Sequence, residues 1–235
     1  MSALKRVGHK GADLIAPGNT VASFDSALAA GVDMIEFDVL PSREDGRLIL
    51  AHDYHDAEGR QPLTLKEGLA HLASVAFASV ELDVDLKLPG YELEVLDALQ
   101  AAGLLGRALI SSQYRESLAL LRAAPAQVRL GWSVPKLRHD PFRNPLMWVP
   151  ASAVVLGWRA RLPAWAEAAV RRGECDALMA HWRLVTPRLV RALQRARGEL
   201  YVWTVDEPAR IRSLERLGVT GVITNDPRLF IRPPT

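Results

Sequence analysis

The chain has 235 residues, of which 49% are hydrophobic and 24% charged, a size and composition that suit one globular core. The formal net charge is only +2, so the charge balance favours no nucleic-acid partner. The single cysteine, Cys175, excludes an internal disulfide and is typical of a protein from a reducing compartment.

The N-terminal residues lack the apolar segment of a signal peptide. No stretch reaches the roughly 18 uninterrupted apolar residues that are needed to span a bilayer. We therefore expect a soluble, cytoplasmic protein without a membrane span. No linker divides the sequence, so we predict one domain over residues 1–235. The sequence makes no prediction of the oligomeric state.

Apolar patterns and turn residues predict eight main strands separated by helices. The strands are expected at residues 4–9, 33–39, 80–86, 108–110, 128–132, 176–180, 200–204 and 221–224. The helices are expected at residues 21–30, 65–73, 92–102, 116–123, 152–172, 187–196 and 208–217. Residues 48–51 form a short extra strand, and the proline-rich residues 135–150 form a long loop. Residues 154–156 could instead be a strand, so the count of eight depends on the helical interpretation.

Alternation of strands and helices is typical of parallel βα units, and eight units at this length indicate a TIM (β/α)8 barrel. The alternative is a doubly wound sheet. The phosphate-binding turn of that fold is missing, because Gly8-His9-Lys10-Gly11 does not match G-x-G-x-x-G. We therefore predict an α/β fold of the TIM-barrel class.

Two carboxylates share one face of the strand expected at residues 33–39. Because side chains alternate across a strand, Glu36 and Asp38 point to one side while Ile35 and Phe37 point to the other. Two like charges this close either raise a pKa or hold a cation, and hard divalent ions prefer carboxylate oxygens. For so short a pattern, a solvated strand face or an ion pair with arginine is the alternative.

Active sites of TIM barrels lie at the carboxyl ends of the strands. The polar residues expected at those ends are His9, Lys10, Glu36, Asp38, His52, Asp85, Lys87, Ser111, Ser112, His181, Trp203, Thr204, Thr224, Asn225 and Asp226. Carboxylates attract a cation, lysines attract an anion, and histidines transfer protons near neutral pH. A phosphate ester bound together with a divalent metal ion satisfies all three groups.

Three acids alternate along the strand expected at residues 80–86, and their depth in the barrel distinguishes them. Successive members lie roughly 6.6–6.8 Å apart along a strand. Asp85 is nearest the carboxyl end, so we expect it beside Glu36 and Asp38. Glu81 is expected near the bottom of the barrel with a basic partner, because an unpaired buried charge is costly. Glu81 and Asp83 remain alternatives for the same role.

Seven motifs, in order, resemble those of the glycerophosphodiester phosphodiesterases. They are His9-Lys10-Gly11, Ala16-Pro17-Gly18-Asn19-Thr20, Ile35-Glu36-Phe37-Asp38-Val39, His52-Asp53, Asp85-Leu86-Lys87, Trp203-Thr204-Val205 and Gly221-Val222-Ile223-Thr224-Asn225-Asp226-Pro227. The resemblance runs from residue 7 to about residue 230. It implies a TIM barrel that holds one divalent cation, Mg²⁺ or Ca²⁺.

The resemblance also implies roles for individual residues. Glu36, Asp38 and Asp85 correspond to the metal ligands, and His9 and His52 to an acid/base pair. Further substrate contacts are expected from the side chains of Lys10, Lys87 and Trp203. Trp203 could equally belong to the core, and Lys87 could be a counter-ion to the acids.

The sequence departs from the family pattern at several places. Where this chain has Lys10, the family usually has arginine. Where it has Gly18 and Asp85, the family usually has glutamate. Lysine keeps the positive charge but loses the bidentate fork to phosphate. Gly18 is expected to change the support of its loop, and Asp-x-Lys at Asp85 is similar to the phospholipase D-like toxins of spider venom. The family often has an insertion between His52-Asp53 and the start of the next helix. Here only residues 54–62 lie between them, so a lid over the pocket is not expected.

The resemblance implies a hydrolase of glycerol and lipid metabolism that cleaves small glycerophosphodiesters to glycerol 3-phosphate and an alcohol. One alternative is a phospholipase D-like lyase that stops at a cyclic phosphate. The other is a barrel that binds a phosphate ligand without catalysis.

Overall fold

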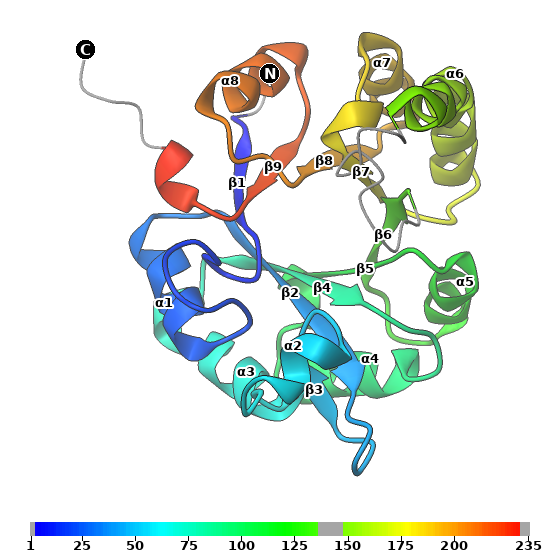
Figure 1. Ribbon diagram of the computed structural model, residues 1–235. Helices are drawn as coiled ribbons and strands as arrows, with labels where there is room; N and C mark the ends of the chain where they lie inside the picture. Colours follow the sequence, from blue (N-terminus) through cyan, green and yellow to red (C-terminus); the bar gives the residue numbers. More distant parts are fainter. Residues whose placement is uncertain (1–2, 136–147, 231–235) are drawn as a thin grey trace.

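The structure is a computed structural model that describes residues 3–135 and 148–230. Within these residues the strands form one nine-stranded sheet, with spatial order β1-β9-β8-β7-β6-β5-β4-β2-β3. A parallel pairing of β1 with β2 closes the ring, while β3 extends β2 as an antiparallel partner outside it. Helices surround the ring (Figure 1). The predicted TIM barrel is therefore confirmed.

The strands are β1 (Lys5–Gly8), β2 (Met34–Pro41), β3 (Leu48–Leu50), β4 (Glu81–Leu86), β5 (Ala108–Ser112), β6 (Arg129–Val134), β7 (Ala177–His181), β8 (Glu199–Trp203) and β9 (Gly221–Thr224). The helices are α1 (Val21–Ala29), α2 (Tyr54–Glu58), α3 (Leu65–Leu72), α4 (Glu92–Ala101), α5 (Arg115–Ala123), α6 (Trp148–Arg171), α7 (Pro187–Ala196) and α8 (Pro208–Leu217). No helix in the described ranges combines the length and the apolarity needed to cross a bilayer.

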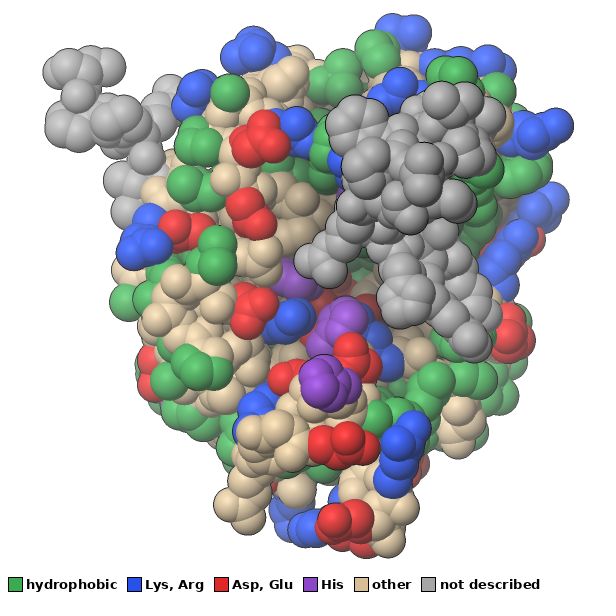
Figure 2. Space-filling view, in the orientation of Figure 1, with side chains coloured by type: hydrophobic (Ala, Val, Ile, Leu, Met, Phe, Trp, Pro, Cys, Tyr) green, Lys and Arg blue, Asp and Glu red, His purple; other side chains and the backbone are tan. Residues whose placement is uncertain are grey.

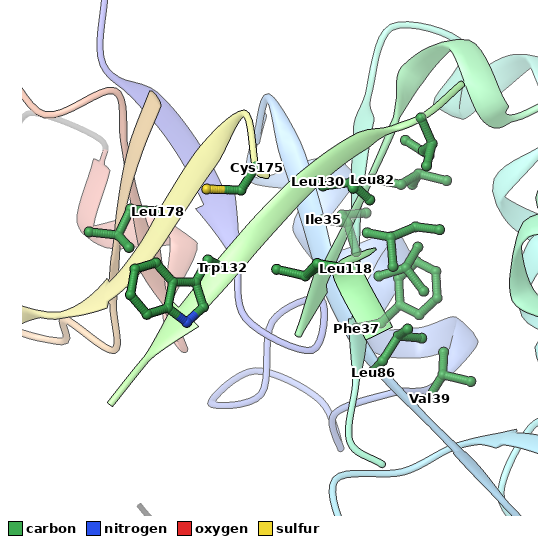
Figure 3. Close-up of a cluster of buried hydrophobic side chains, with 14 of the residues drawn as sticks. Ile35, Phe37, Val39, Leu82, Leu86, Leu118, Leu130, Trp132, Cys175 and Leu178 are labelled. Atoms are coloured by element: carbon green, nitrogen blue, oxygen red, sulfur yellow. The ribbon is translucent and has the colours of Figure 1, made fainter. Parts of the chain in front are cut away.

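Two hydrophobic layers follow from the alternation of side chains along the strands. Ile35 and Phe37 point outward and pack under the helices, in the cluster shown in Figure 3. Met34 points into the barrel, where it packs with Tyr201 and Met179 in a smaller inner cluster. The inner cluster fills the barrel below the polar residues at the carboxyl ends of the strands, so an open site is expected only at the mouth of the barrel.

The register between β2 and β4 brings acidic residues from distant parts of the chain together. Asp38 lies opposite Asp85, and Glu36 lies opposite Asp83. At the lower end of β4, Glu81 forms ion pairs with Lys5, at 2.6 Å, and with Arg129. The expectation that Glu81 lies near the barrel bottom with a basic partner is thus confirmed.

Local differences from the sequence predictions lie at element ends and in short elements. The five-residue helix α2 was not predicted, because a pattern this short has no apolar period. Helix α6 begins at Trp148, so the prediction of loop at residues 148–150 was wrong. Residues 154–156 are helical rather than a strand. The rest of the predicted loop, residues 136–147, lies outside the described residues.

Gly221 leaves the space that Tyr201 occupies at the barrel bottom. A Cβ atom at position 221 would lie 2.7 Å from the Tyr201 ring and 3.1 Å from the backbone oxygen of Lys5. We therefore expect Gly221→Ala to lower the free energy of unfolding in urea by about 1–3 kcal/mol, the usual range for overpacking. Gly106→Ala is the matched control, because nothing lies within 4 Å of a Cβ there. Equal effects of the two substitutions would contradict the packing argument.

Candidate active site

Three carboxylates meet at the mouth of the barrel. Glu36, Asp38 and Asp85, here called the acidic cluster, offer oxygen atoms that all lie within 4.8 Å of one another. Glu36 and Asp38 come from the same face of β2, and Asp85 from the neighbouring strand β4. Asp38 is fully buried. Such a concentration of charge is costly unless positive charge compensates it.

Lys87 supplies positive charge inside the acidic cluster. Its ammonium group forms ion pairs with Asp38 Oδ1 and, at 2.5 Å, with Asp85 Oδ2. Burial alone would lower the pKa of Lys87, but the carboxylates outweigh it and raise this pKa well above its usual value. Burial would likewise raise the pKa of Asp38, but Lys87 and the two neighbouring histidines hold it below its usual value. The pair is therefore ionised.

Glu36 of the acidic cluster and its neighbour Asp83 are poorly compensated. Burial raises the pKa of Glu36 well above its usual value, and the negative charge of Asp38 raises it further. Burial and, to a smaller extent, the negative charge of Asp85 raise the pKa of Asp83 to about 8. Oδ1 of Asp83 has no hydrogen-bond partner among the described residues. The mouth of the barrel thus has more carboxyl groups than Lys87 can neutralise.

His9 stands at one side of the acidic cluster, held by a chain of hydrogen bonds. Its Nε2 lies 3.8 Å from Glu36, and its Nδ1 lies 2.5 Å from Asn225 Oδ1. Asn225 Nδ2 donates to Asp206 at 2.6 Å, which fixes the orientation of the amide because a carboxylate can only accept. The amide oxygen therefore accepts from His9 Nδ1, and Nε2 faces the cluster. Burial lowers the pKa of His9, which favours the neutral imidazole.

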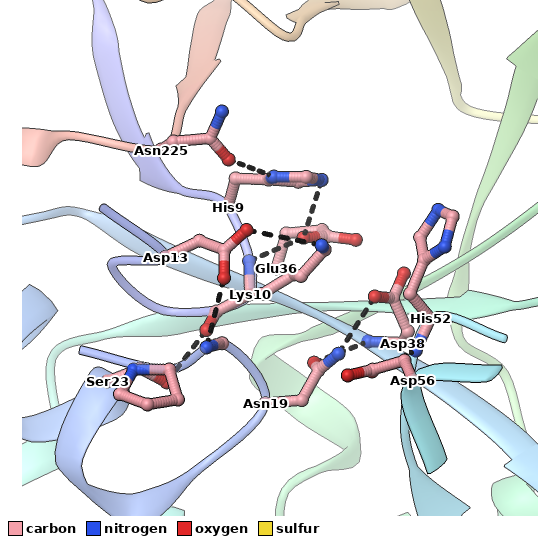
Figure 4. A network of polar contacts seen from close by, with 12 residues as sticks. His9, Lys10, Asp13, Asn19, Ser23, Glu36, Asp38, His52, Asp56 and Asn225 are labelled. Carbon is pink, nitrogen blue, oxygen red and sulfur yellow. Dashed lines mark hydrogen bonds and ion pairs between the residues drawn. The ribbon is translucent and has the colours of Figure 1, made fainter. Parts of the chain in front are cut away.

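His52 approaches the acidic cluster from the opposite side, after β3 (Figure 4). Its side chain is 49% exposed, and its Nδ1 lies 3.1 Å from Asp53. Asp53 also caps α2, by accepting a hydrogen bond from the backbone N–H of Asp56. The unpredicted helix α2 therefore serves to position the second histidine.

The loop after β1 binds the acidic cluster through groups that the sequence analysis missed. The backbone N–H of Lys10 donates to Glu36 at 2.8 Å, and the amide of Asn19 donates to Asp38 at 2.9 Å. Lys10 and Asn19 both adopt the left-handed conformation, with φ of 50° and 58°. The sequence alone makes Asn19 or Thr20 a candidate for the N-cap of the following helix. Thr20 is the cap, which leaves the Asn19 side chain free to reach the site.

The side chain of Lys10 has a different neighbour from the one expected. Its ammonium pairs with Asp13 at 3.2 Å, and Lys10 is not among the described residues that line the pocket. Asp13 also accepts a hydrogen bond from the backbone of Gly18 at 3.0 Å. A Cβ atom at position 18 would overlap the Asp13 carboxylate, and it would lie 2.8 Å from Lys10 Cβ. The loop in this form therefore requires glycine at position 18.

The two histidines, Glu36, Asp85 and Lys87 line a pocket of about 190 Å³. Figure 2 shows histidine, acidic and basic side chains gathered around this mouth. The lining residues are His9, Glu36, His52, Asp83, Asp85, Lys87, Ser111, Gln113, Ser133, Met179, Trp203, Thr204 and Ile223. Trp203, for which the sequence left both the pocket wall and the core open, lines the pocket and also packs against the inner hydrophobic cluster.

The acidic cluster fits a divalent cation. Three carboxylate oxygens on one small site are the ligands that hard cations prefer. The ammonium of Lys87 shows that a positive charge is accommodated between Asp38 and Asp85. Glu36, Asp38 and Asp85 could therefore hold a metal ion.

Comparison with known proteins agrees with this geometry. The model of the glycerophosphoryl diester phosphodiesterase family matches residues 9–63 and 139–229. The chain belongs to this family. A glycerophosphodiester phosphodiesterase of Caldanaerobacter subterraneus is 24% identical over 257 aligned positions, which cover 96% of this chain and 95% of that protein.

Solved structures of similar proteins show the same fold. A putative glycerophosphoryl diester phosphodiesterase from Silicibacter pomeroyi superposes with a TM-score of 0.74 at 19% identity, covering 97% of this chain and 92% of that one. An Oleispira antarctica phosphodiesterase in complex with the product sn-glycerol-3-phosphate has a TM-score of 0.69 at 20% identity, with coverage of 96% and 94%. The resemblance noted in the sequence is therefore confirmed at the level of the family and the fold.

Lys87 is expected to stabilise the metal-free protein. Removing one partner of a buried ion pair typically costs about 3–5 kcal/mol, because the other charge stays buried without compensation. We expect Lys87→Met to lower the free energy of unfolding by this amount, measured by urea denaturation in EDTA. Lys66→Met, at an exposed position on α3, is the matched control and should have an effect within about 0.5 kcal/mol. Unchanged stability of Lys87→Met would show that the cluster is compensated in another way.

Proposed function

We propose that this protein is a divalent-metal-dependent phosphodiester hydrolase that cleaves glycerophosphodiesters to glycerol 3-phosphate and an alcohol. The observation that supports this most strongly is the acidic cluster with histidines on two opposite sides, in a pocket of about 190 Å³. Membership of the glycerophosphoryl diester phosphodiesterase family points to the same reaction. The Oleispira relative with bound sn-glycerol-3-phosphate supports a small-molecule substrate.

In this proposal Glu36, Asp38 and Asp85 hold the cation, Mg²⁺ or Ca²⁺. When bound, the ion neutralises charge that develops on the phosphate oxygens. Lys87 adds positive charge at the same place. We propose no contact between Lys10 and the phosphate, because its ammonium pairs with Asp13 and Lys10 does not line the pocket.

His9 and His52 are proposed as the proton-transfer pair. One takes a proton from the attacking hydroxyl group, and the other donates a proton to the leaving alcohol. The hydrogen bond from Nδ1 of His9 to Asn225 directs its Nε2 to the reaction side. The attacking hydroxyl belongs to the glycerol of the substrate in this mechanism, so a cyclic phosphate forms first and water then opens it. Trp203 forms part of the wall against which the substrate lies.

We further propose that residues 1–235 act as one domain and that the protein works in the cytoplasm. The free thiol of Cys175 suits that compartment.

The metal assignment predicts a specific pattern of substitutions. Asp85→Asn and Glu36→Gln should each weaken binding of Mg²⁺ or Ca²⁺ at least about tenfold in isothermal titration calorimetry, because each removes a charged ligand. Excess EDTA should abolish turnover. Asp83→Asn is the matched control, since Asp83 lies one step deeper on the same face of β4 and outside the acidic cluster. Loss of metal binding in Asp83→Asn with normal binding in Asp85→Asn would overturn the assignment.

The histidine assignment predicts a loss of rate without a loss of fold. His9→Ala and His52→Ala should each reduce turnover of a glycerophosphodiester by about 10²–10⁴-fold, the usual contribution of general acid–base catalysis. Far-ultraviolet circular dichroism should be unchanged. His55→Ala, at an exposed position on α2, should keep the wild-type rate. A folded His52→Ala variant at full rate would remove His52 from the mechanism.

Products distinguish the remaining alternatives. Hydrolysis yields glycerol 3-phosphate in ³¹P NMR, whereas a phospholipase D-like lyase would leave a cyclic phosphate as the final product. A barrel that only binds phosphate ligands would give no turnover with any of a panel of headgroups and divalent ions.

A further inference from the structure

A second cavity lies on the outer wall of the barrel, between helix α5 and the end of α6. Its volume is about 580 Å³, roughly three times that of the active-site pocket. The lining residues are Arg115, Glu116, Leu118, Ala119, Arg122, Ala123, Trp132, Ala169, Arg172, Gly173, Glu174 and Cys175. None of these residues lines the active-site pocket, so this cavity is a separate site.

The cavity exists because two neighbouring helices of the outer layer are spread apart. Helix α5 packs against α4, and α6 packs against α7 (Figure 1). The cavity lies between α5 and the end of α6, over strand β6. Trp132 on β6 points outward into this space, while its neighbour Ser133 points to the active-site pocket. The floor of the cavity is therefore the barrel wall itself.

The floor is apolar and its groups are firmly placed. Trp132, Cys175 and Leu118 are all buried in the outer hydrophobic cluster (Figure 3). Burial raises the pKa of the Cys175 thiol to about 12, so this thiol is protonated and unreactive at neutral pH. The floor thus favours reversible binding of an apolar group over covalent chemistry.

One end of the cavity has a preorganised pair of guanidinium groups. Arg115 and Arg172 both bind Glu174, the latter at 2.6 Å, so two positive charges share one carboxylate there. The Arg115 guanidinium also lies 5.0 Å from the centre of the Trp132 ring, which fixes it next to the floor. A guanidinium has five N–H donors, so a bond to Glu174 leaves donors for another anion.

We propose that this cavity binds a small amphiphilic anion, with an alkyl or aromatic body on Trp132 and a carboxylate or phosphate between Arg115 and Arg172. A recessed site of this volume, mostly apolar with few convergent polar groups, is typical of small-molecule sites. The local excess of positive charge at Glu174 selects an anion over a cation. The preorganised arginines lower the entropy cost of binding. This inference does not rest on the proposed hydrolase activity.

The test measures binding of dodecanoate, below its micellar concentration, to the intact protein in EDTA by isothermal titration calorimetry. We expect one site per chain. Ala119→Trp, at an exposed position of α5 over the cavity, should weaken binding at least about tenfold, because it occupies the space of the alkyl chain. Leu120→Trp is the matched control on the same helix and should bind as the wild type does, since Leu120 does not line the cavity.

The charge of the site is tested in the same way. Arg172→Gln should weaken dodecanoate binding by about threefold, as expected for a partly exposed ion pair. Arg171→Gln, one residue earlier and paired with Glu167 outside the cavity, should leave it unchanged. Dodecyltrimethylammonium, which has the same chain and the opposite charge, should bind more weakly than dodecanoate.

Three results would overturn the proposal. The first is the absence of dodecanoate binding, and the second is equal binding of the cationic amphiphile. The third is competition by saturating sn-glycerol 3-phosphate together with full binding in Ala119→Trp, which would place the fatty acid in the active-site pocket instead. All these measurements are made without turnover, so a failed activity assay would not affect them.

Discussion

The mutual repulsion of carboxyl groups at the mouth of the barrel is the constraint on which the rest of the site depends. Parallel pairing of β2 with β4 places Asp38 beside Asp85 and Glu36 beside Asp83. Lys87 neutralises part of this charge from within. The loop after β1 then contributes a backbone N–H to Glu36 and the Asn19 amide to Asp38. A site built in this way attracts a cation because its own compensation is incomplete.

Strand β4 carries three acidic side chains on one face, and their depth in the barrel gives them different ion-pair partners and pKa values. Glu81 is at the bottom, where Lys5 and Arg129 keep its pKa below the usual value against the effect of burial. Asp83 is in the middle, where burial and the nearby Asp85 raise its pKa to about 8. Asp85 is at the mouth, within reach of Lys87. Side-chain alternation puts all three on one face, and their different positions along the strand give them different electrostatic environments.

The parts of this site that could be predicted are those that depend on local period. The alternation in β2 and β4 indicated which face each acid takes and which acid lies deepest, and both expectations are confirmed. The support of His9 could not be predicted, because Asn225 is 216 positions away and reaches it only when β9 pairs with β1. The direction of the Lys10 side chain could not be predicted either, because it depends on a left-handed backbone conformation at a non-glycine residue.

Asp13 lies between the two positions of the loop after β1 at which this chain departs from the family pattern. The resemblance gives arginine and glutamate as the usual residues at positions 10 and 18, where this chain has Lys10 and Gly18. Asp13 contacts both, through an ion pair with the ammonium and a hydrogen bond from the glycine N–H. Its carboxylate fills the space that a side chain at position 18 would need. The negative partner of the Lys10 ammonium therefore comes from within the loop, at Asp13. A glutamate at position 18 would therefore displace Asp13 from its place beside Lys10.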